Sequence, residues 1–350
     1  MDALARYLGR YPRHVTAFIL ICFVLEIGVV TDYIENTVWP RRAEAHQARI
    51  AGDIATADKL FTRKRFSTAL NEYRFVLNAH GPDLSAAETG RVKDAIGLCY
   101  FHMAARRNER ENLEHAIAAF GVALGARALE SQPMAYAETQ IHLGQARQAL
   151  AGAPGAGEVM AEAMAAYREA LKVRAAETDP AGHATARRLL GDAYLDLQAI
   201  APEDSNIDQA FAYFETALSV LDPAVHAEEI GLTLLARGRA FVVKADGRYS
   251  KRHLEEAIKT FEKALAVLVP EKFPRHYGLV HQHIGDAYTL LTKTKPRSRS
   301  GRAGHRQRTM FWDNRAKQAY RIATNFGAPG LNGAIVDDGD AHAASDADKK

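Results

Sequence analysis

The sequence contains few of the residues and motifs that usually indicate a reaction. Cys22 and Cys99 are its only cysteines, and two distant thiols make neither a disulfide framework nor a metal cluster. No HExxH, CxxC or phosphate-loop motif occurs, and the glycine-rich run at 152–158 lacks the lysine and the preceding strand of a phosphate loop. His281 and His283 would face different sides of a helix. The sequence therefore predicts no enzymatic activity, no cofactor and no metal site.

The sequence also lacks a large excess of either positive or negative charge. The 45 Lys and Arg residues stand against 42 Asp and Glu residues, which gives a net charge of +3. Such a balance does not indicate nucleic acid as a partner. The composition, 47% hydrophobic and 25% charged, is that of an ordinary folded protein. A length of 350 residues suggests two domains, but internal repeats override this estimate.

One long hydrophobic run occurs, near the N-terminus. Residues 15–30 contain a single charged side chain, Glu26, and aromatic residues flank the run on both sides. Extension to residue 34 gives the about 20 residues that a membrane-spanning helix needs. We expect residues 15–34 to be an uncleaved transmembrane anchor, after a short tail at 1–14 and before a connector at 35–49.

Three features of this segment stay open. A cleaved signal peptide is the main rival, although no small-x-small cleavage site follows the run. Arginines are equally numerous before and after it, but those before it lie closer, and Asp32 and Glu35 follow it directly. This arrangement favours a cytoplasmic N-terminus, with the repeats in the periplasm if the source is bacterial and the anchor spans its inner membrane. Glu26, costing roughly 2.5–3.5 kcal/mol near the centre of a span, either snorkels or is protonated, or contacts a partner's membrane helix.

A repeat of 47 residues runs through most of the chain. Glycine recurs at positions 97, 144, 191, 238 and 285. Three more series keep the same step: Ala69, Ala116, Ala163, Ala210 and Ala257; Tyr73, Phe120, Tyr167, Phe214 and Phe261; and Leu77, Leu124, Leu171, Leu218 and Leu265. Each unit holds two stretches with apolar residues at three- and four-residue steps, which indicates amphipathic helices. The pattern predicts an all-α solenoid of five units over 50–292.

The repeated glycine needs a physical reason. Glycine inside a helix costs about 1 kcal/mol relative to alanine, and here it returns in every unit. We expect two helix backbones to approach too closely at this position for a side chain. The small residue two positions after each glycine fits the same close contact.

Two motifs in each unit resemble the tetratricopeptide repeat (TPR) family. One helix carries LG-x-A-Y, as at 190–194, and another carries A-x-x-x-[FY]-x-x-A-L, as at 163–171. Residues 52–77 are closest to the family's standard form, whereas later units are about 13 residues longer than its usual 34. The resemblance covers roughly residues 50–325 and implies an α-α superhelical solenoid that binds other proteins. It identifies no partner.

In this family the glycine-bearing helices line the concave surface. The positions three before, one after and about one turn beyond the glycines are Asp94, Leu98, Phe101, Ile141, Gln145, Gln148, Arg188, Asp192, Leu195, Leu235, Arg239, Gln282 and Asp286. The resemblance implies that they form a partner-binding groove, although part of the set fits plain solvated surface equally well. The lysine- and asparagine-rich clamp with which some relatives hold a chain-terminal carboxylate is missing, so that ligand is not expected.

A basic segment, residues 293–309, follows the fifth unit. It contains Lys293, Lys295, Arg297, Arg299, Arg302, Arg306 and Arg308 and no acidic residue. It is either a solvated insertion or a contact for anionic lipid or an acidic protein; nucleic acid ranks last, because the run has no aromatic residue for base stacking. Residues 310–327 predict a capping helix, and the Gly/Ala/Asp-rich tail at 328–350 predicts disorder.

These patterns predict a membrane-anchored, TPR-like scaffold that mediates protein–protein interaction and complex assembly. The alternative is a structural subunit of a larger membrane complex, in which Glu26 and the span also make contacts. In both cases we expect protein partners, and the sequence does not name them.

Overall fold

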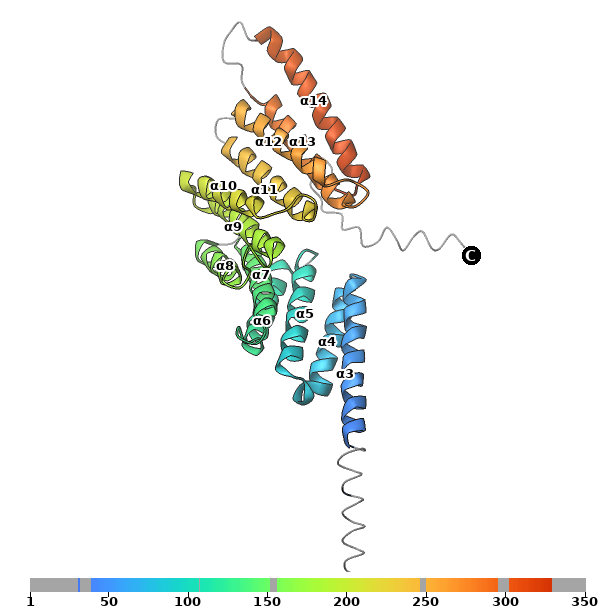
Figure 1. Ribbon diagram of the computed structural model, residues 1–350. Helices are drawn as coiled ribbons and strands as arrows, with labels where there is room; N and C mark the ends of the chain where they lie inside the picture. The colour runs from blue at the N-terminus through green and yellow to red at the C-terminus, as the bar shows by residue number, and fades with distance from the viewer. Residues whose placement is uncertain are drawn as a thin grey trace, which may run out of the picture. The chain divides into compact units, whose positions relative to one another are not determined.

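A computed structural model describes residues 31, 39–106, 108–151, 156–245, 250–294 and 302–328 (Figure 1). These ranges are all-helical and contain no strand. The chain divides into two compact units, Met1–Asp83 and Leu84–Lys350, called here unit 1 and unit 2.

The helices follow one another with short connections. Unit 1 contains α3 (Trp39–Thr62), α4 (Phe66–His80) and the 3-10 turn η2 (Gly81–Asp83). Unit 2 contains α5 (Ala86–Ala104), α6 (Glu109–Ala126), α7 (Pro133–Leu150), α8 (Ala156–Leu171), α9 (Pro180–Ile200), α10 (Asp204–Ser219), α11 (Ala227–Ala245), α12 (Lys251–Val267), α13 (Pro274–Thr292) and α14 (Arg302–Asn325). Helix α3 begins at Trp39, within the predicted connector at 35–49.

Local sequence explains where several helices begin. Pro133, Pro180 and Pro274 are the first residues of α7, α9 and α13, a position where the missing N–H of proline costs nothing. Ser85 caps α5: its hydroxyl accepts a hydrogen bond from the Glu88 N–H at 3.2 Å, and the Glu88 carboxylate accepts one from the Ser85 N–H at 2.9 Å. The Ser85 hydroxyl also donates to Glu88 Oε2 at 2.6 Å, and this hydrogen bond, together with the one from the Ser85 N–H, lowers the pKa of Glu88.

In unit 1, α3 and α4 pack against each other around a small apolar core. Ile50, Ile54 and Val76 are buried in it. Tyr73 is also buried, and its hydroxyl donates a hydrogen bond to Asp58 Oδ1 at 2.6 Å. The aromatic position of the sequence repeat is therefore a core position in α4.

In unit 2, each glycine-bearing helix packs on the helix that follows it, in the pairs α5–α6, α7–α8, α9–α10, α11–α12 and α13–α14. The glycine-bearing helices also contact one another in order, from α5 through α7, α9 and α11 to α13. The aromatic side chains of the second helices, Phe120, Tyr167, Phe214 and Phe261, are fully buried. They form the centre of each pair.

The repeated glycines make room for these rings. A Cβ atom built on each glycine would lie under 3.0 Å from an aromatic carbon, in the pairs Gly97–Phe120, Gly144–Tyr167, Gly191–Phe214, Gly238–Phe261 and Gly285–Tyr320. The expectation that two backbones meet there was wrong, since the nearest atoms belong to ring side chains. An aromatic ring fills the space instead, which is why a side chain on the glycine is excluded.

A second small position was not predicted from the sequence. It lies seven residues before each repeated glycine and holds Gly90, Ala137, Ala184, Gly231 and Gly278. A Cβ atom on Gly90 would lie 2.7 Å from Arg127 Cγ, and one on Gly231 would meet Leu268. The α5–α6 and α11–α12 pairs are thus closed by a small residue facing a large one at the end of the pair as well as at its centre.

Helix α14 begins eight residues before the predicted capping helix at 310–327, so Arg302, Arg306 and Arg308 lie in a helix instead of an insertion. Within the described ranges, no helix is long and apolar enough to cross a membrane. The predicted anchor, except Thr31, lies outside those ranges, as do Glu26 and the tail beyond residue 328.

Candidate binding surface on the glycine-bearing helices

The predicted groove residues lie on five consecutive glycine-bearing helices. Asp94, Leu98 and Phe101 are on α5, Ile141, Gln145 and Gln148 on α7, Arg188, Asp192 and Leu195 on α9, Leu235 and Arg239 on α11, and Gln282 and Asp286 on α13. Five of them, Asp94, Ile141, Asp192, Leu195 and Leu235, are buried, and the other eight are half-buried. Their role in partner binding stays a prediction. Their contacts within the chain show which side chains are already hydrogen-bonded and which could still contact a partner.

Polar contacts connect the first four of these helices in order. They join Asp94 on α5 to His142 on α7 at 3.2 Å, Gln148 on α7 to Asp196 on α9 at 2.6 Å, and Asp192 on α9 to Arg239 on α11 at 3.1 Å. The partners are 47 or 48 residues apart. The repeat therefore sets equivalent faces of neighbouring helices against each other, and their polar side chains bond across the junction.

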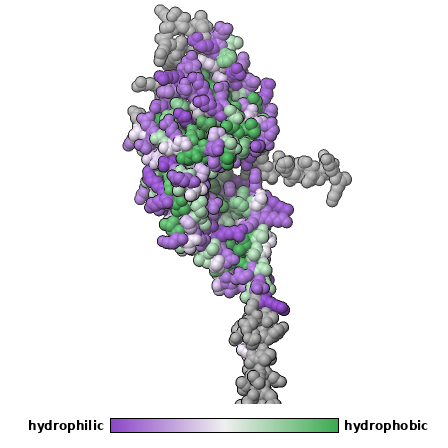
Figure 2. Space-filling model, viewed as in Figure 1, coloured by the Kyte–Doolittle hydropathy of each residue, from purple (hydrophilic) through white to green (hydrophobic). Residues whose placement is uncertain are grey.

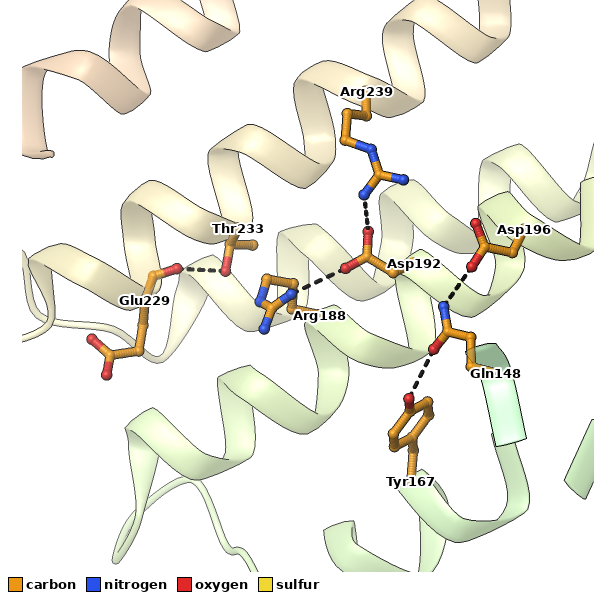
Figure 3. A network of polar contacts seen from close by, with 8 residues as sticks. All are labelled: Gln148, Tyr167, Arg188, Asp192, Asp196, Glu229, Thr233 and Arg239. Carbon is orange, nitrogen blue, oxygen red and sulfur yellow. Dashed lines mark hydrogen bonds and ion pairs between the residues drawn. The ribbon is translucent and has the colours of Figure 1, made fainter. Parts of the chain in front are cut away.

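Asp192 is the centre of the densest part of this network (Figure 3). Its carboxylate accepts a hydrogen bond from Arg188 at 3.1 Å and one from Arg239 at 3.1 Å. Burial raises the pKa of Asp192, and the two guanidinium groups oppose that change. A buried carboxylate is tolerated when it is paired and hydrogen-bonded. Asp192 therefore links α9 to α11 and has little capacity left for a ligand.

Two tyrosines on the second helices of their pairs donate hydrogen bonds to other groove residues. Tyr167 donates a hydrogen bond to Gln148 Oε1 at 2.8 Å, and the amide of Gln148 donates in turn to Asp196 (Figure 3). Tyr320 on α14 donates to Asp286 Oδ1 at 2.7 Å. Burial is the main reason why the pKa of Tyr167 is raised, and it raises that of Tyr320 to about 12. Both hydroxyls are thus held as protonated donors.

A depression of about 980 Å³ lies where the C-terminal ends of α9, α11 and α13 meet the first turns of α10 and α12. Its described apolar lining includes Leu195, Ile207, Val242, Val243, Leu254 and Leu290. Apolar side chains also gather over α11 and its neighbours on the face of unit 2 seen in Figure 2. Only Leu195 was in the predicted set. Applying the one-turn rule to every unit would have added Val242, four residues after Gly238, but nothing in the sequence places Ile207 or Leu254 beside it.

Four residues that line this depression are polar: Gln198, Asp208, Lys244 and His253. Lys244 Nζ lies 3.1 Å from Asp208 Oδ1 at its edge. Nδ1 of His253 is buried and has no hydrogen-bond partner in the described part of the chain. An unmade hydrogen bond at a buried nitrogen is costly. The described residues hold no group of three metal-ligating side chains.

The basic residues that the sequence grouped together are divided. Lys293 is exposed directly after α13, and Arg302, Arg306 and Arg308 lie in α14. Lys295, Arg297 and Arg299 lie outside the described residues.

Comparison with known proteins finds similar solved structures. No protein-family model matches the chain, and no curated protein is similar to it. RapI in its apo form is a similar solved structure, with 12% identity and a TM-score of 0.49 over 79% of this chain and 99% of that one. The C-terminal part of a TPR repeat-containing protein from Cytophaga hutchinsonii has 13% identity and a TM-score of 0.32 over 77% of this chain and 98% of that one. Both TM-scores lie below 0.5, so the fold rests on the helix pairs described above.

Proposed function

We propose that this protein is a protein-interaction scaffold whose unit 2 receives a segment of another protein. The observation that carries the proposal is the apolar depression between the ends of α9, α11 and α13. The polar groove residues Asp94 and Gln148, nearer α5, are already bonded to His142 and Asp196. The apolar side chains at the depression are where a partner gains most by removing surface from water, at roughly 25 cal/mol per Å².

The depression indicates what kind of segment fits. Its volume of about 980 Å³ is near the upper end of the ~300–1,000 Å³ typical of ligand pockets, so it has room for several side chains. The half-buried Val242 and Leu290 suit apolar anchors from an amphipathic helix, as in helix-in-groove recognition. His253 and the ion pair of Lys244 with Asp208 suit the polar edge of such a segment.

The membrane anchor is part of the same proposal. The hydrophobic segment at 15–34 would hold the scaffold at a bilayer, and the TPR-like motifs of the repeats support recruitment of proteins there. Alkaline carbonate extraction checks the anchor separately: the full chain should stay in the membrane pellet, and release into the supernatant would refute anchoring without touching the scaffold role.

A photo-cross-linking amino acid at Val243 tests the binding site in the full chain. A matched probe at Val122, exposed on α6, serves as the control surface. We expect a discrete adduct from position 243 that is absent from position 122 and is lost when Leu290→Glu places a charge in the depression. Identical adducts from both positions, or an adduct that survives Leu290→Glu, would contradict the proposed site.

A further inference from the structure

The outward face of α14 exposes two large apolar side chains next to each other. Met310 is 62% and Phe311 is 53% exposed, although the adjacent Trp312 is buried. Ala316 and Ala319 continue the buried stripe at helical spacing, and α14 packs mainly on α13. The apolar pair is thus not needed for the packing of the helix on its neighbour.

Basic side chains surround this pair. Arg306, Arg308, Arg315, Lys317 and Arg321 are all exposed. Asp313 is the one acidic residue in the sequence of α14, and its carboxylate lies 2.7 Å from Lys317 Nζ. None of the four arginines forms an ion pair within the described residues. The face therefore carries an excess of positive charge that the rest of the described chain does not neutralise.

Helical geometry puts the cations on both sides of the apolar pair. At 100° per residue, Arg306 and Lys317 flank the side of Met310, and Arg321 lies between Met310 and Phe311, closer to Met310. Arg308 and Arg315 flank the side of Phe311, and the Arg315 guanidinium carbon lies 5.4 Å from the Phe311 ring centroid. Exposed apolar side chains with cations beside them combine the two interactions that a helix makes with an anionic membrane interface.

We propose that this face of α14 binds the surface of an anionic lipid bilayer. Met310 and Phe311 enter the boundary between headgroups and acyl chains, and the flanking arginines contact the anionic headgroups. An acidic protein would satisfy the arginines but would leave the exposed apolar pair unexplained. This surface lies apart from the depression on α9, α11 and α13, so it does not depend on the proposed scaffold site.

The test reads α14 locally, because residues 15–34 of the full chain could bind lipid by themselves. An environment-sensitive dye is attached to Asn314→Cys, an exposed position on the same face. Cys22→Ser and Cys99→Ala remove the native thiols; alanine already stands at the positions of the other four units that correspond to Cys99. The labelled full chain is titrated with vesicles of phosphatidylcholine alone or mixed with phosphatidylglycerol.

We expect a blue shift of the dye on the anionic vesicles only, lost when roughly 1 M salt shortens the Debye length to about 3 Å. Met310→Ser with Phe311→Ser should raise the lipid needed for half the shift at least about tenfold. Each arginine changed to glutamine should raise it about fivefold. Val122→Ser, an equally exposed apolar position on α6, is the matched control and should change nothing.

Three results would overturn the proposal. One is an equal shift on neutral vesicles, and another is a shift that survives the Met310 and Phe311 substitutions. The third is a dye that responds to polyglutamate but to no vesicle, which would assign this face to an acidic protein.

Discussion

The first and fourth helix pairs of unit 2 solve the same packing problem with opposite chemistry. The position compared lies 37 residues after the small residue at 90, 137, 184 or 231. The early pairs, α5–α6 and α7–α8, have Arg127 and Arg174 there, and the later pairs, α9–α10 and α11–α12, have Leu221 and Leu268. Arg127 is only 6% exposed, and Leu268 is fully buried. The same repeat fold therefore accepts either a guanidinium or an isobutyl group at the end of a helix pair.

The charged solution needs many partners. Arg127 donates hydrogen bonds to the Ala135 carbonyl at 2.9 Å and to Thr139, and lies 3.9 Å from the Asp94 carboxylate. Arg174 donates to Asp179 at 2.6 Å. Leu268 needs only the space that Gly231 leaves. The difference teaches that the ends of the early pairs are held by specific polar pairing, whereas the ends of the α9–α10 and α11–α12 pairs are held by apolar packing and leave apolar side chains at the candidate site. Asp192 and Arg239 still pair across α9 and α11.

Exchanging the two chemistries should produce the largest effect. Leu268→Arg would bury a guanidinium among apolar neighbours with no carboxylate in place, so we expect a loss of about 3–5 kcal/mol in the free energy of unfolding. Urea denaturation of the full chain in detergent measures it. Val269→Arg, on the exposed next residue, is the control. Equal losses in the two variants would mean that Leu268 does not need apolar surroundings at the end of its helix pair.

Acid should lower the stability of the C-terminal part of unit 2 through His283 on α13. Burial, followed by the Arg239 charge, lowers the pKa of His283 to about 4, although Asp286 opposes this. An unfolded histidine titrates near 6.5, so between about 6.5 and 4 the unfolded state binds the proton that the folded state refuses. Stability is therefore lost as the pH falls through this window, by up to about 3 kcal/mol for this group.

Thermal melts of wild type and His283→Leu across this window isolate the contribution of His283, since leucine occupies the corresponding position 189. The variant should lose less stability than wild type between the two pH values. A parallel decline of both proteins would show that His283 titrates normally.

The glycine–ring contact is common to both halves, so it should respond equally in both. Gly144→Leu and Gly238→Leu each force a side chain against a buried ring, Tyr167 or Phe261. We expect each to cost about 1–3 kcal/mol, measured as a drop in the thermal midpoint. Phe261→Ala added to Gly238→Leu should restore part of the loss, and a midpoint that falls further would argue against a direct conflict with the ring.

The smallest net effect should come from converting the early junction into the later type. Arg127→Leu alone leaves Asp94 with His142 as its remaining ion-pair partner and should destabilise the fold by about 1–3 kcal/mol. Adding Asp94→Ile, which copies Ile141 of the next unit, removes the second charge. The free energy of unfolding of the double variant, taken from thermal melts, should lie within about 1 kcal/mol of the wild-type value. Well-packed apolar residues often replace a buried ion pair at no cost. An additive loss would mean that the polar junction itself specifies the fold.

Several parts of this structure could be predicted from residue order. Apolar spacing identified the helices, since an amphipathic face repeats every three to four residues. The start of α14 was missed, because its first turns, around Gly304 and Arg306, have no apolar stripe. The groove residues were placed on the expected helices, but their mutual bonds were not foreseen. Asp192 and Arg239 are 47 residues apart, and spacing alone does not show whether two equivalent side chains point toward each other or toward solvent.

By itself, then, the sequence determined the helical class, the 47-residue period and the positions of glycine and aromatic residue in every unit, because these follow from local periodicity. Only the tertiary structure decided that the ring of the second helix, and not a neighbouring backbone, fills the space at each glycine. It also decided that Asp192 is consumed by two arginines and that Val242, Leu254 and Leu290 meet at one depression. The physical reason is that packing and ion pairing depend on distances between helices, which are set by the volumes of all the side chains between them.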